Sequence, residues 1–361
     1  MRDSVGTTEA AARVSGPESA PTGAGAAAAP RLAIVMPAYQ AAHLLPQTLP
    51  PLVANPLGAE VLVVDPGSTD GTADVAERLG ARVLRLGRRA GPAEARNAGT
   101  ELVDADVVLF VDSDCVAHAD TVERVHRAFA DDPQLVTLTG SYDDTPPDPG
   151  FFSQYMNLRH HATHQHARRE NATFWAGCGA VRRDAFLQVG GFDAALYPRP
   201  MIEDIELGMR MAPLGRTCLD PALHVTHLKR WTLRSTVHTD VFCRAVPWSR
   251  LLRERGGMPN DLNLRTSQRV AALLAPLALL ACVALPALLV LGSVWALVPA
   301  ALIAASLALN ADLVLSFLRR RGLGFALGGW LFHQVHLFYS AVTFVVVALA
   351  VALGPRRTAA R

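Results

Sequence analysis

The stretch Val107-Val108-Leu109-Phe110-Val111-Asp112-Ser113-Asp114 decides the fold, because an apolar run ends abruptly in two carboxylates one residue apart. A short run of β-branched and aromatic residues predicts a strand that is buried on both faces, as in parallel sheets. In open α/β sheets ligands bind outside the carboxyl ends of the strands, so Asp112 and Asp114 are expected to face a binding crevice. Carboxylate oxygens at this spacing suit Mg²⁺ or Mn²⁺ holding a diphosphate. For an isolated pair, the alternative is a turn in which one aspartate caps the following helix.

The amino-acid composition indicates a protein that is part soluble and part membrane-embedded. The chain has 361 residues, and 50% of them are hydrophobic, which is high for a purely soluble protein. A formal net charge of +2 gives no broad basic field, so we expect no nucleic acid partner. The five cysteines are scattered without a Cys-x-x-Cys pair, which is typical of reduced thiols rather than of a zinc ribbon or a disulfide framework.

The order of predicted elements indicates a parallel sheet with helices on both faces. Alternation of strand and helix is the pattern of an α/β domain, and it is predicted here from strands at 32–39, 60–65 and 82–86 and helices at 72–80 and from residue 91. We assign this domain to residues 31–265. Residues 1–30 are rich in Ala, Gly, Pro, Ser and Thr and are expected to be a disordered tail. The tail has no apolar segment of the kind that a signal peptide requires, so the domain is expected in the cytoplasm.

Five short motifs follow one another along the domain, each at a strand end or a helix start. They are Pro37-Ala38-Tyr39, the stretch 65–72 (DPGSTDGT), the stretch 91–99 ending in Ala95-Arg96-Asn97-Ala98-Gly99, Asp112-Ser113-Asp114, and Glu203-Asp204. In this order the set resembles the family 2 glycosyltransferases, over roughly residues 32–255. The resemblance implies the GT-A fold of nucleotide-diphospho-sugar transferases, a Rossmann-like and mostly parallel α/β sheet. One departure is Pro66, where many relatives have a second acid, and it bears on the contact to the nucleobase.

The resemblance assigns roles to individual residues. The donor-binding residues it implies are Pro37, Tyr39, Asp65, Arg96, Asn97, Asp112, Ser113 and Arg230. A divalent cation, Mn²⁺ or Mg²⁺, is implied at Asp112, Asp114 and His227, where it would act as a Lewis acid on the leaving diphosphate. His227 is favoured over His224 because a histidine after the acidic helix completes the metal shell in some relatives. For Asp65, a turn that simply ends the strand is an equal alternative.

The stretch 201–210 (MIEDIELGMR) is expected to carry the general base. It has helical period and opens with acids, where the helix dipole favours negative charge. By resemblance Asp204 deprotonates the acceptor hydroxyl with Glu203 as its neighbour, and a single displacement then inverts the anomeric centre. Without the other motifs, the alternative is an acidic first turn that only supports the helix.

Aromatic and basic residues further along are expected on the acceptor side. Trp175 and Gly177 lie in a stretch that borders donor sugar and acceptor in the family, so Trp175 is either a stacking platform or a packing residue beside tight turns. His227-Leu228-Lys229-Arg230-Trp231 resembles the Gln-x-x-Arg-Trp motif of membrane-embedded polysaccharide synthases, with His in place of Gln. Arg230 would hold the diphosphate and Trp231 would cover the acceptor terminus. The alternative is a cation and an aromatic at the membrane interface.

A second histidine group falls on a predicted helix and comprises His160, His161, His164 and His166. His160 and His164 lie one turn apart, as metal ligands can. No cysteine or acid close in sequence completes a tetrahedral set. A polar helix face near the acceptor or the membrane surface is therefore favoured over metal binding.

Residues 266–354 are predicted to form the membrane region, followed by a tail at 355–361. Three apolar stretches are each long enough to cross about 30 Å of hydrocarbon; they are 270–291, 294–318 and 326–353. Arg265 and Arg269 before the first stretch and the basic residues 319–321 fall on one side, which predicts a multi-pass protein of the cell membrane with its catalytic domain in the cytoplasm. The third stretch is the most polar and could instead re-enter or lie in the interface. Its polar residues would meet a lipid head group or saccharide, or pack between helices; they are His333, Gln334, His336 and Tyr339.

The sequence therefore predicts a membrane-anchored inverting glycosyltransferase that moves a sugar from a nucleoside diphosphate sugar to a lipid-linked or membrane-embedded acceptor at the cytoplasmic face. A processive polysaccharide synthase is the second enzyme hypothesis, disfavoured by the half-matched motif and the small number of spans. A non-catalytic scaffold that binds nucleotide sugar through a degenerate site is the hypothesis from another class. The joint presence of Asp112, Asp114 and Asp204 argues against it.

Overall fold

The first four strands are those predicted from the sequence. In the computed structural model, which describes residues 29–170, 173–255 and 265–353, they are β1 (Leu32–Pro37), β2 (Glu60–Asp65), β3 (Arg82–Arg85) and β4 (Val107–Val111). They pair in parallel in the order β3-β2-β1-β4. The chain order reverses between β1 and β4, and the crevice that such a reversal opens lies beyond Pro37 and Val111. The predicted tails lie outside the described residues, apart from residues 29 and 30.

The second half of the sheet adds antiparallel pairs to the parallel ones, so the sheet is mixed. It adds β5 (Cys115–Ala117), β6 (Leu135–Tyr142), β7 (Cys178–Arg182) and β8 (Arg216–His227) in the spatial order β4-β7-β6-β8-β5. β7 runs antiparallel to both β4 and β6, and β5 antiparallel to β8, while β6 and β8 are parallel. The sequence of β7, CGAVR, has few of the β-branched and aromatic residues that are enriched in strands, which is why it gave no strand signal.

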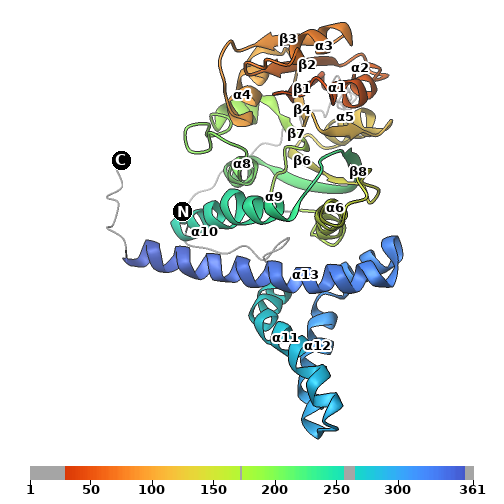
Figure 1. Ribbon diagram of the computed structural model, residues 1–361. Coiled ribbons are helices and arrows are strands. Elements are labelled where there is room, and N and C mark those ends of the chain that lie inside the picture. The colour runs from red at the N-terminus through yellow and green to blue at the C-terminus, as the bar shows by residue number, and fades with distance from the viewer. Residues whose placement is uncertain (1–28, 171–172, 256–264, 354–361) are drawn as a thin grey trace, which may run out of the picture.

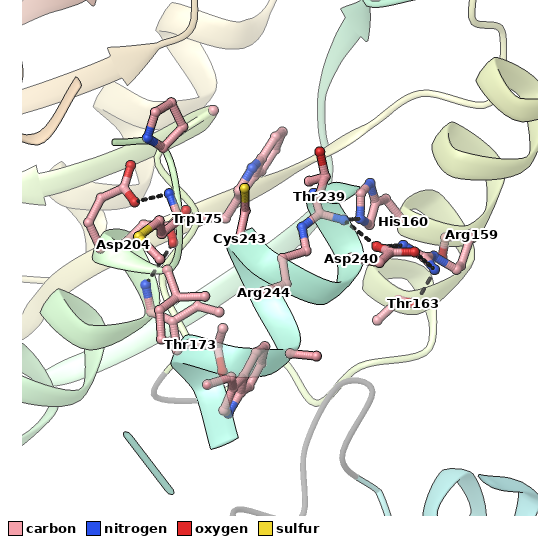
Figure 2. Close-up of a pocket in the computed structure, with 18 of the residues that line it drawn as sticks. Arg159, His160, Thr163, Thr173, Trp175, Asp204, Thr239, Asp240, Cys243 and Arg244 are labelled. Atoms are coloured by element: carbon pink, nitrogen blue, oxygen red, sulfur yellow. Dashed lines mark hydrogen bonds and ion pairs between the residues drawn. The ribbon is translucent and has the colours of Figure 1, made fainter. Parts of the chain in front are cut away.

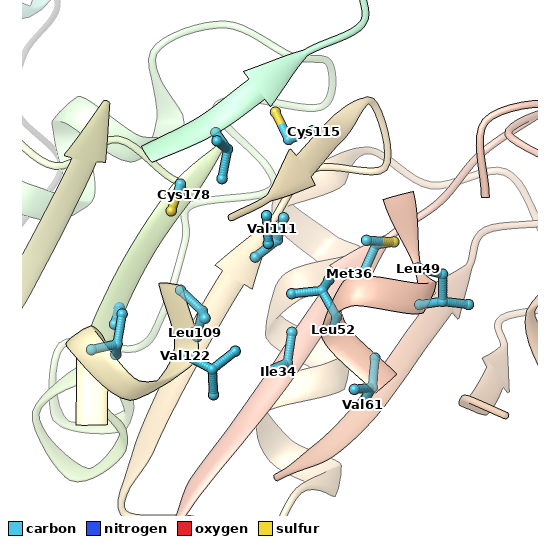
Figure 3. Packing of buried hydrophobic residues seen from close by; sticks show 14 of the residues in the cluster. Ile34, Met36, Leu49, Leu52, Val61, Leu109, Val111, Cys115, Val122 and Cys178 are labelled. Carbon is cyan, nitrogen blue, oxygen red and sulfur yellow. The ribbon is translucent and has the colours of Figure 1, made fainter. Parts of the chain in front are cut away.

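Alternate residues of the buried strands pack against helices on opposite faces. Ile34 and Met36 of β1 join a core with α1 (Leu45–Thr48), α2 (Pro50–Val53), α3 (Thr72–Arg78) and α5 (Thr121–Asp131), which Figure 3 shows from close by. Ala33 and Val35 join a second core with α4 (Pro92–Leu102), α7 (Arg183–Gln188) and α8 (Glu203–Met211). The period of two along a strand produces this division. Each fully buried aliphatic side chain contributes about 1.5–3 kcal/mol.

The remaining helices lie at one end of the α/β domain (Figure 1). They are α6 (Phe151–Gln165), α9 (Leu233–His238), a π-helical segment (Thr239–Ala245), α10 (Val246–Arg255), α11 (Thr266–Val290), α12 (Leu297–Leu309) and α13 (Ala311–Leu353), with 3₁₀ turns at Ala212–Leu214 and Val294–Ala296. α13 passes beneath the domain, and α11 and α12 project away from it. At Gly322, φ is 78° and ψ is 179°, so α13 consists of two helices that meet at a kink.

The described residues hold two helices that are long and apolar enough to cross a membrane, where the sequence predicted three such spans. They are α11 and α13, and the predicted first and third stretches lie in them. The predicted stretch 294–318 is instead divided into a 3₁₀ turn, α12 and the start of α13. α12 ends at Asn310, whose Nδ2 donates to the carbonyl of Ser306 at 2.8 Å. A 13-residue helix spans only about 20 Å, less than the hydrocarbon thickness.

Polar side chains connect α13 to its neighbours. Arg320 forms an ion pair with Asp144, and Arg321 Nε donates to Gln154 Oε1 at 2.5 Å, so the predicted basic cluster contacts the α/β domain and α6. In the third stretch, Gln334 Oε1 accepts from Ser306 Oγ of α12 at 2.9 Å. His333, His336 and Tyr339 instead bond to residues of α6 and of the π-helical segment. The structure thus shows packing for these groups, both between helices and onto the α/β domain.

Candidate active site

One cavity of about 1860 Å³ collects most of the predicted site residues. It opens at the carboxyl ends of β1 and β4 and continues to the C-terminal helices. The predicted residues that line it are Pro37, Tyr39, Arg96, Asp112, Ser113, Asp114, Trp175, Gly177, Glu203, Asp204, His227 and Trp231. Each of the five motifs, or a residue beside it, therefore contributes to the lining of this one cavity.

Three predicted donor-binding residues do not line this cavity. Asp65 is buried, and its Oδ1 accepts from the amide of Ser68 at 2.8 Å, so it shapes the turn that ends β2. Asn97 is paired in both directions with the backbone of Phe192 at 2.8 Å. Arg230 has a side chain that is 83% exposed, and its Nε lies 3.6 Å from a carboxylate oxygen of Asp148, beside a separate shallow depression.

Arg96 connects the end of β4 to the start of α8. Only 4% of its side chain is exposed; one terminal nitrogen donates to Asp112 Oδ1 at 2.5 Å, and the other lies 3.5 Å from Glu203 Oε1. Burial raises the pKa of both carboxyl groups, while the nearby guanidinium opposes the rise. The arginine thus compensates the negative charge of two acids that lie close together at the crevice.

Asp114 and His227 meet because β5 pairs with β8. Cys115 lies opposite His227 in the ladder, and His227 Nε2 is 3.4 Å from Asp114 Oδ2. Burial raises the pKa of Asp114, but the hydrogen bond and charge of His227 outweigh it and lower that pKa to about 2. The ring of Tyr142 stacks on the imidazole, with centroids 4.2 Å apart and planes 10° apart. This contact fixes the orientation of His227, the histidine favoured from the sequence.

The donor atoms at this end fit a divalent cation that is bound together with a substrate. Asp114 and His227 offer oxygen and nitrogen side by side, and Asp112 keeps one carboxylate oxygen that Arg96 does not contact at hydrogen-bond distance. In the described ranges no three His, Cys, Asp or Glu side chains come close enough to hold a metal by themselves. Mg²⁺ is usually held by one or two carboxylates plus substrate phosphates, so an incomplete protein shell suits a diphosphate-bound ion. The pair His160 and His164 is different, because His160 Nε2 accepts from Arg244 at 2.9 Å.

Asp204 stands in the first turn of α8 at the other side of the crevice. Its Oδ2 accepts from the amide of Ala176 at 3.3 Å and its Oδ1 from its neighbour Ile205 at 2.8 Å. Burial raises the pKa of Asp204, and the negative charge of Glu203 raises it further, to about 7. A carboxylate with that pKa can accept a proton near neutral pH.

Trp175 forms the wall next to Asp204, as Figure 2 shows. A Cβ at Gly177 would lie 2.3 Å from the indole, so only glycine allows the ring to rest there. The ring also contacts Tyr142 edge-on with centroids 4.6 Å apart and His164 with centroids 5.5 Å apart. The indole therefore packs tightly beside the turn and also borders the cavity, and its role as a stacking platform stays a prediction.

The far part of the cavity is lined by a polar network that the sequence did not reveal. Its centre is Asp240 of the π-helical segment, which accepts from Arg159 at 2.9 Å and from Tyr339 at 2.7 Å. Arg244 lies on the same segment, and its Nη1 is 3.4 Å from Asp240. Arg159 and Tyr339 come from distant segments, and Asp240 and Arg244 form an ordinary i,i+4 pair on one helix, so no local spacing marks the network. The only signal was the polar group in the third apolar stretch.

The fold and the strand-end acids define a nucleotide-sugar transferase domain of the GT-A type. The sequence model of the family described as "Glycosyl transferase family 2" matches residues 33–190. The chain therefore carries a glycosyltransferase domain of family 2.

Known proteins with similar sequences are glycosyltransferases. A validoxylamine A glucosyltransferase of Streptomyces hygroscopicus subsp. jinggangensis is 34% identical over 34% of this chain and 32% of its own length. A pre-mycofactocin glycosyltransferase of Mycobacterium tuberculosis is 27% identical over 53% of this chain and 42% of its own length. This chain thus spans less than half the length of either relative.

A solved structure shows the same fold over most of the chain. It is a mannosyltransferase from Pyrobaculum calidifontis in complex with GDP-Man and Mn²⁺, with a TM-score of 0.57 and 20% identity. The superposition covers 88% of this chain and 87% of that one. Because 88% is more than the α/β domain holds, the likeness extends into the C-terminal helices.

Proposed function

We propose that this protein transfers a sugar, with inversion, from a nucleoside diphosphate sugar to an acceptor in the membrane, with its catalytic domain in the cytoplasm. The observation that carries the proposal is the continuity of one cavity. Its first part is lined by the acids at the end of β4 and by the start of α8. Its second part is lined by apolar side chains of the C-terminal helices, among them Leu273, Leu309 and Phe344. A polar donor and a lipid-bearing acceptor could thus meet in one space.

The donor would bind at the strand ends. Asp112, Asp114 and His227 would hold Mn²⁺ or Mg²⁺ together with the diphosphate, and the cation would stabilise the negative charge of the leaving group. Pro37, Tyr39 and Ser113 line the adjoining wall, which would receive the nucleoside. The solved mannosyltransferase, which contains GDP-Man and Mn²⁺, supports a nucleotide sugar with a divalent cation here.

Asp204 would act on the acceptor. Its carboxylate would accept the proton of the acceptor hydroxyl while that oxygen attacks the anomeric carbon from the face opposite the diphosphate. Glu203 would tune this base rather than replace it, because its own oxygens are engaged by Arg96 and by the amide of Met201 at 2.7 Å. One displacement inverts the configuration.

The membrane orientation is supported by the contacts of the basic turn. Arg320 and Arg321 bond to Asp144 and Gln154, so the turn at 319–322 lies on the same side as the catalytic domain. Positively charged turns favour the cytoplasmic side. Nucleotide sugars are made there, which agrees with a cytoplasmic donor site.

A processive synthase is a weaker proposal than single transfer. Arg230, which would hold the diphosphate in that hypothesis, faces Asp148 outside the cavity. Trp231 is buried and lines the cavity, but its ring is covered by the ammonium of Lys229 at 4.3 Å. Of the two residues that the Gln-x-x-Arg-Trp resemblance assigns to the site, Trp231 lines the cavity and Arg230 does not.

The test is a donor screen with purified protein in detergent. Hydrolysis of nucleoside diphosphate sugars would be measured with Mn²⁺, with Mg²⁺ and with a chelator, and then transfer to lipids extracted from membranes. We expect cation-dependent hydrolysis of one donor and transfer to an extractable lipid. A protein that bound a donor but neither hydrolysed nor transferred it would instead support the scaffold hypothesis.

A further inference from the structure

The membrane-side end of the cavity is lined by three helical segments, α6, the π-helical segment and α10, which contribute a cluster of polar side chains, most of them nitrogen donors. The cluster comprises Arg159, His160 and His164 of α6, Asp240 and Arg244 of the π-helical segment, and Trp248 of α10. All of them line the same cavity as Asp204. Figure 2 shows Asp204 and Trp175 on one side of this space and Arg244, His160 and Asp240 on the other. We call this set the Arg244 cluster.

The Arg244 cluster carries an excess positive charge. Arg159 and Asp240 form two parallel hydrogen bonds of 2.9 and 3.1 Å, so these two charges compensate each other. Among the described residues the guanidinium of Arg244 has weaker contacts, since its Nη1 lies 3.4 Å from Asp240 Oδ1 and 2.9 Å from the imidazole Nε2 of His160. Burial lowers the pKa of His164 to about 4 and that of His160 below its ordinary value, so both imidazoles are neutral near pH 7. The charge available to a ligand is that of Arg244.

Several donor atoms along the same walls have no acceptor among the described residues. They are Trp231 Nε1, Trp248 Nε1 and Arg265 Nε, and each can only donate. In the part of the chain that the structure describes, His164 Nδ1 and His333 Nε2 are also buried without a hydrogen-bond partner. Leaving buried donors unpaired is costly, so this lining suits a ligand that presents several acceptor oxygens. Together with the charge of Arg244, it suits a phosphate group.

A single aromatic ring separates the Arg244 cluster from His227 at the strand ends. The ring of Tyr142 stacks on His227 and also contacts His160, with centroids 5.8 Å apart. A second connection runs through Trp175, whose ring contacts His164, because the amide of the next residue, Ala176, donates to Asp204. A head group that held its phosphate at Arg244 would therefore have its polar atoms close to the base.

The cluster also lies where the apolar helices begin. Arg265 directly precedes α11, whose apolar residues from Val270 onward form a candidate membrane span. Below this level the cavity wall is apolar, with Leu273, Leu337 and Phe344. Phosphates of membrane lipids occupy the same boundary between polar and apolar layers.

We propose that the Arg244 cluster binds the phosphate of a phosphate-bearing lipid whose own hydroxyl is the acceptor. This inference rests on the proposed function and names its substrate class. In the reaction the hydroxyl proton passes to Asp204 and the oxygen forms a bond to the anomeric carbon. The bond from that carbon to the diphosphate oxygen breaks, and the nucleoside diphosphate leaves with the electron pair. The lipid phosphate takes no part in bond making and serves to hold the head group.

The test measures binding of defined lipids to the full-length protein in neutral detergent. Short-chain phosphatidylglycerol offers phosphate and hydroxyls, diacylglycerol offers a hydroxyl without phosphate, and inorganic phosphate lacks the chains; binding would be followed by quenching of tryptophan fluorescence. Phosphatidylglycerol is expected to bind at least about tenfold more tightly than either of the others, because only it satisfies both the charged cluster and the apolar walls. Tighter binding of inorganic phosphate would identify a free anion as the ligand and overturn the lipid assignment.

Three variants connect this binding to the cluster. Arg244→Gln should weaken phosphatidylglycerol binding about tenfold or more, Arg244→Lys should restore part of it, and Trp248→Phe should weaken it several-fold by removing one donor. Arg250→Gln is the matched control, since Arg250 is exposed on α10 and does not line the cavity. Binding of a nucleoside diphosphate with Mn²⁺ reports whether each variant is folded. Unchanged lipid affinity in folded Arg244→Gln would refute this inference alone, whereas a wild type that bound no nucleotide would refute the proposed function.

Discussion

If Asp204 is the general base, sugar transfer should depend on pH in a specific way. The base works only when ionised, and burial together with the charge of Glu203 raises its pKa to about 7. At pH 6 about one tenth of the molecules would then carry an ionised base, and at pH 8 about nine tenths. We therefore expect kcat/KM for transfer to rise about tenfold per pH unit below pH 7 and to level off above it.

Two substitutions separate the base from its neighbour. Asp204→Asn keeps the size of the side chain but cannot accept a proton, so transfer should fall by about 10²–10⁴-fold while binding of nucleoside diphosphate and cation stays nearly unchanged. Glu203→Gln removes the like charge and leaves Arg96 freer to attract Asp204. Both effects lower the pKa of Asp204, so the rise of kcat/KM with pH should occur at lower pH in this variant.

The assay is transfer of a labelled sugar to membrane lipid, measured from pH 5 to 9 with about saturating cation. Asp74→Asn is the matched control, because Asp74 also stands in the first turn of a helix but is exposed and pairs with Arg85. An Asp204→Asn variant that kept transfer within a few-fold would refute the assignment. So would a rise of kcat/KM that did not move to lower pH in Glu203→Gln.

Three further predictions concern the cation, the topology and the core. Asp114→Ala should abolish the gain in nucleoside diphosphate affinity that Mn²⁺ gives, measured by calorimetry; an equal gain in the variant would move the cation elsewhere. A reporter inserted in the turn 319–322 should be cytoplasmic and one fused after Leu353 external, and matching cytoplasmic signals would show that α13 lies along the membrane surface instead. Phe110→Ala should lower the free energy of unfolding in a denaturant titration by about 3–5 kcal/mol, because this buried ring contacts the rings of Phe186 and Phe192. A loss below about 1 kcal/mol would mean that the core closes around the gap.

The sequence predicted the features that depend on local periodicity. β2 was located to the residue, and the strand-end position of Asp112 follows from the apolar run before it. β7 was missed because its small residues carry no strand signal. It matters for the site, since its start and the preceding loop position Gly177, whose carbonyl accepts from the amide of Asp112 at 3.2 Å.

Contacts between distant segments could not be predicted in this way. Asn97 looked like a donor-binding residue, but its amide group anchors Phe192, which is 95 residues away. A break at Asn310 divides the predicted stretch 294–318 between α12 and the start of α13, which hydropathy alone did not indicate. Asp240 and Arg159 are 81 positions apart and meet only because α6 and the π-helical segment pack together under the sheet.

The participation of α13 in the wall of the cavity has a consequence for how such proteins can diversify. His336 and Tyr339 contact Asp240 from the apolar helix α13, while the proposed cation ligands all come from the α/β domain. The proposed acceptor site thus depends on two stretches of the gene, since the Arg244 cluster lies within residues 159–248 and the apolar wall comes from the helices after residue 265. Exchanging the segment after residue 265 between related chains should alter which lipid chains fit the apolar wall, while the Arg244 cluster and the sugar that is delivered stay the same. For the same reason, a version cut at residue 255 would retain the strand-end acids but lose one side of the chamber in which they work.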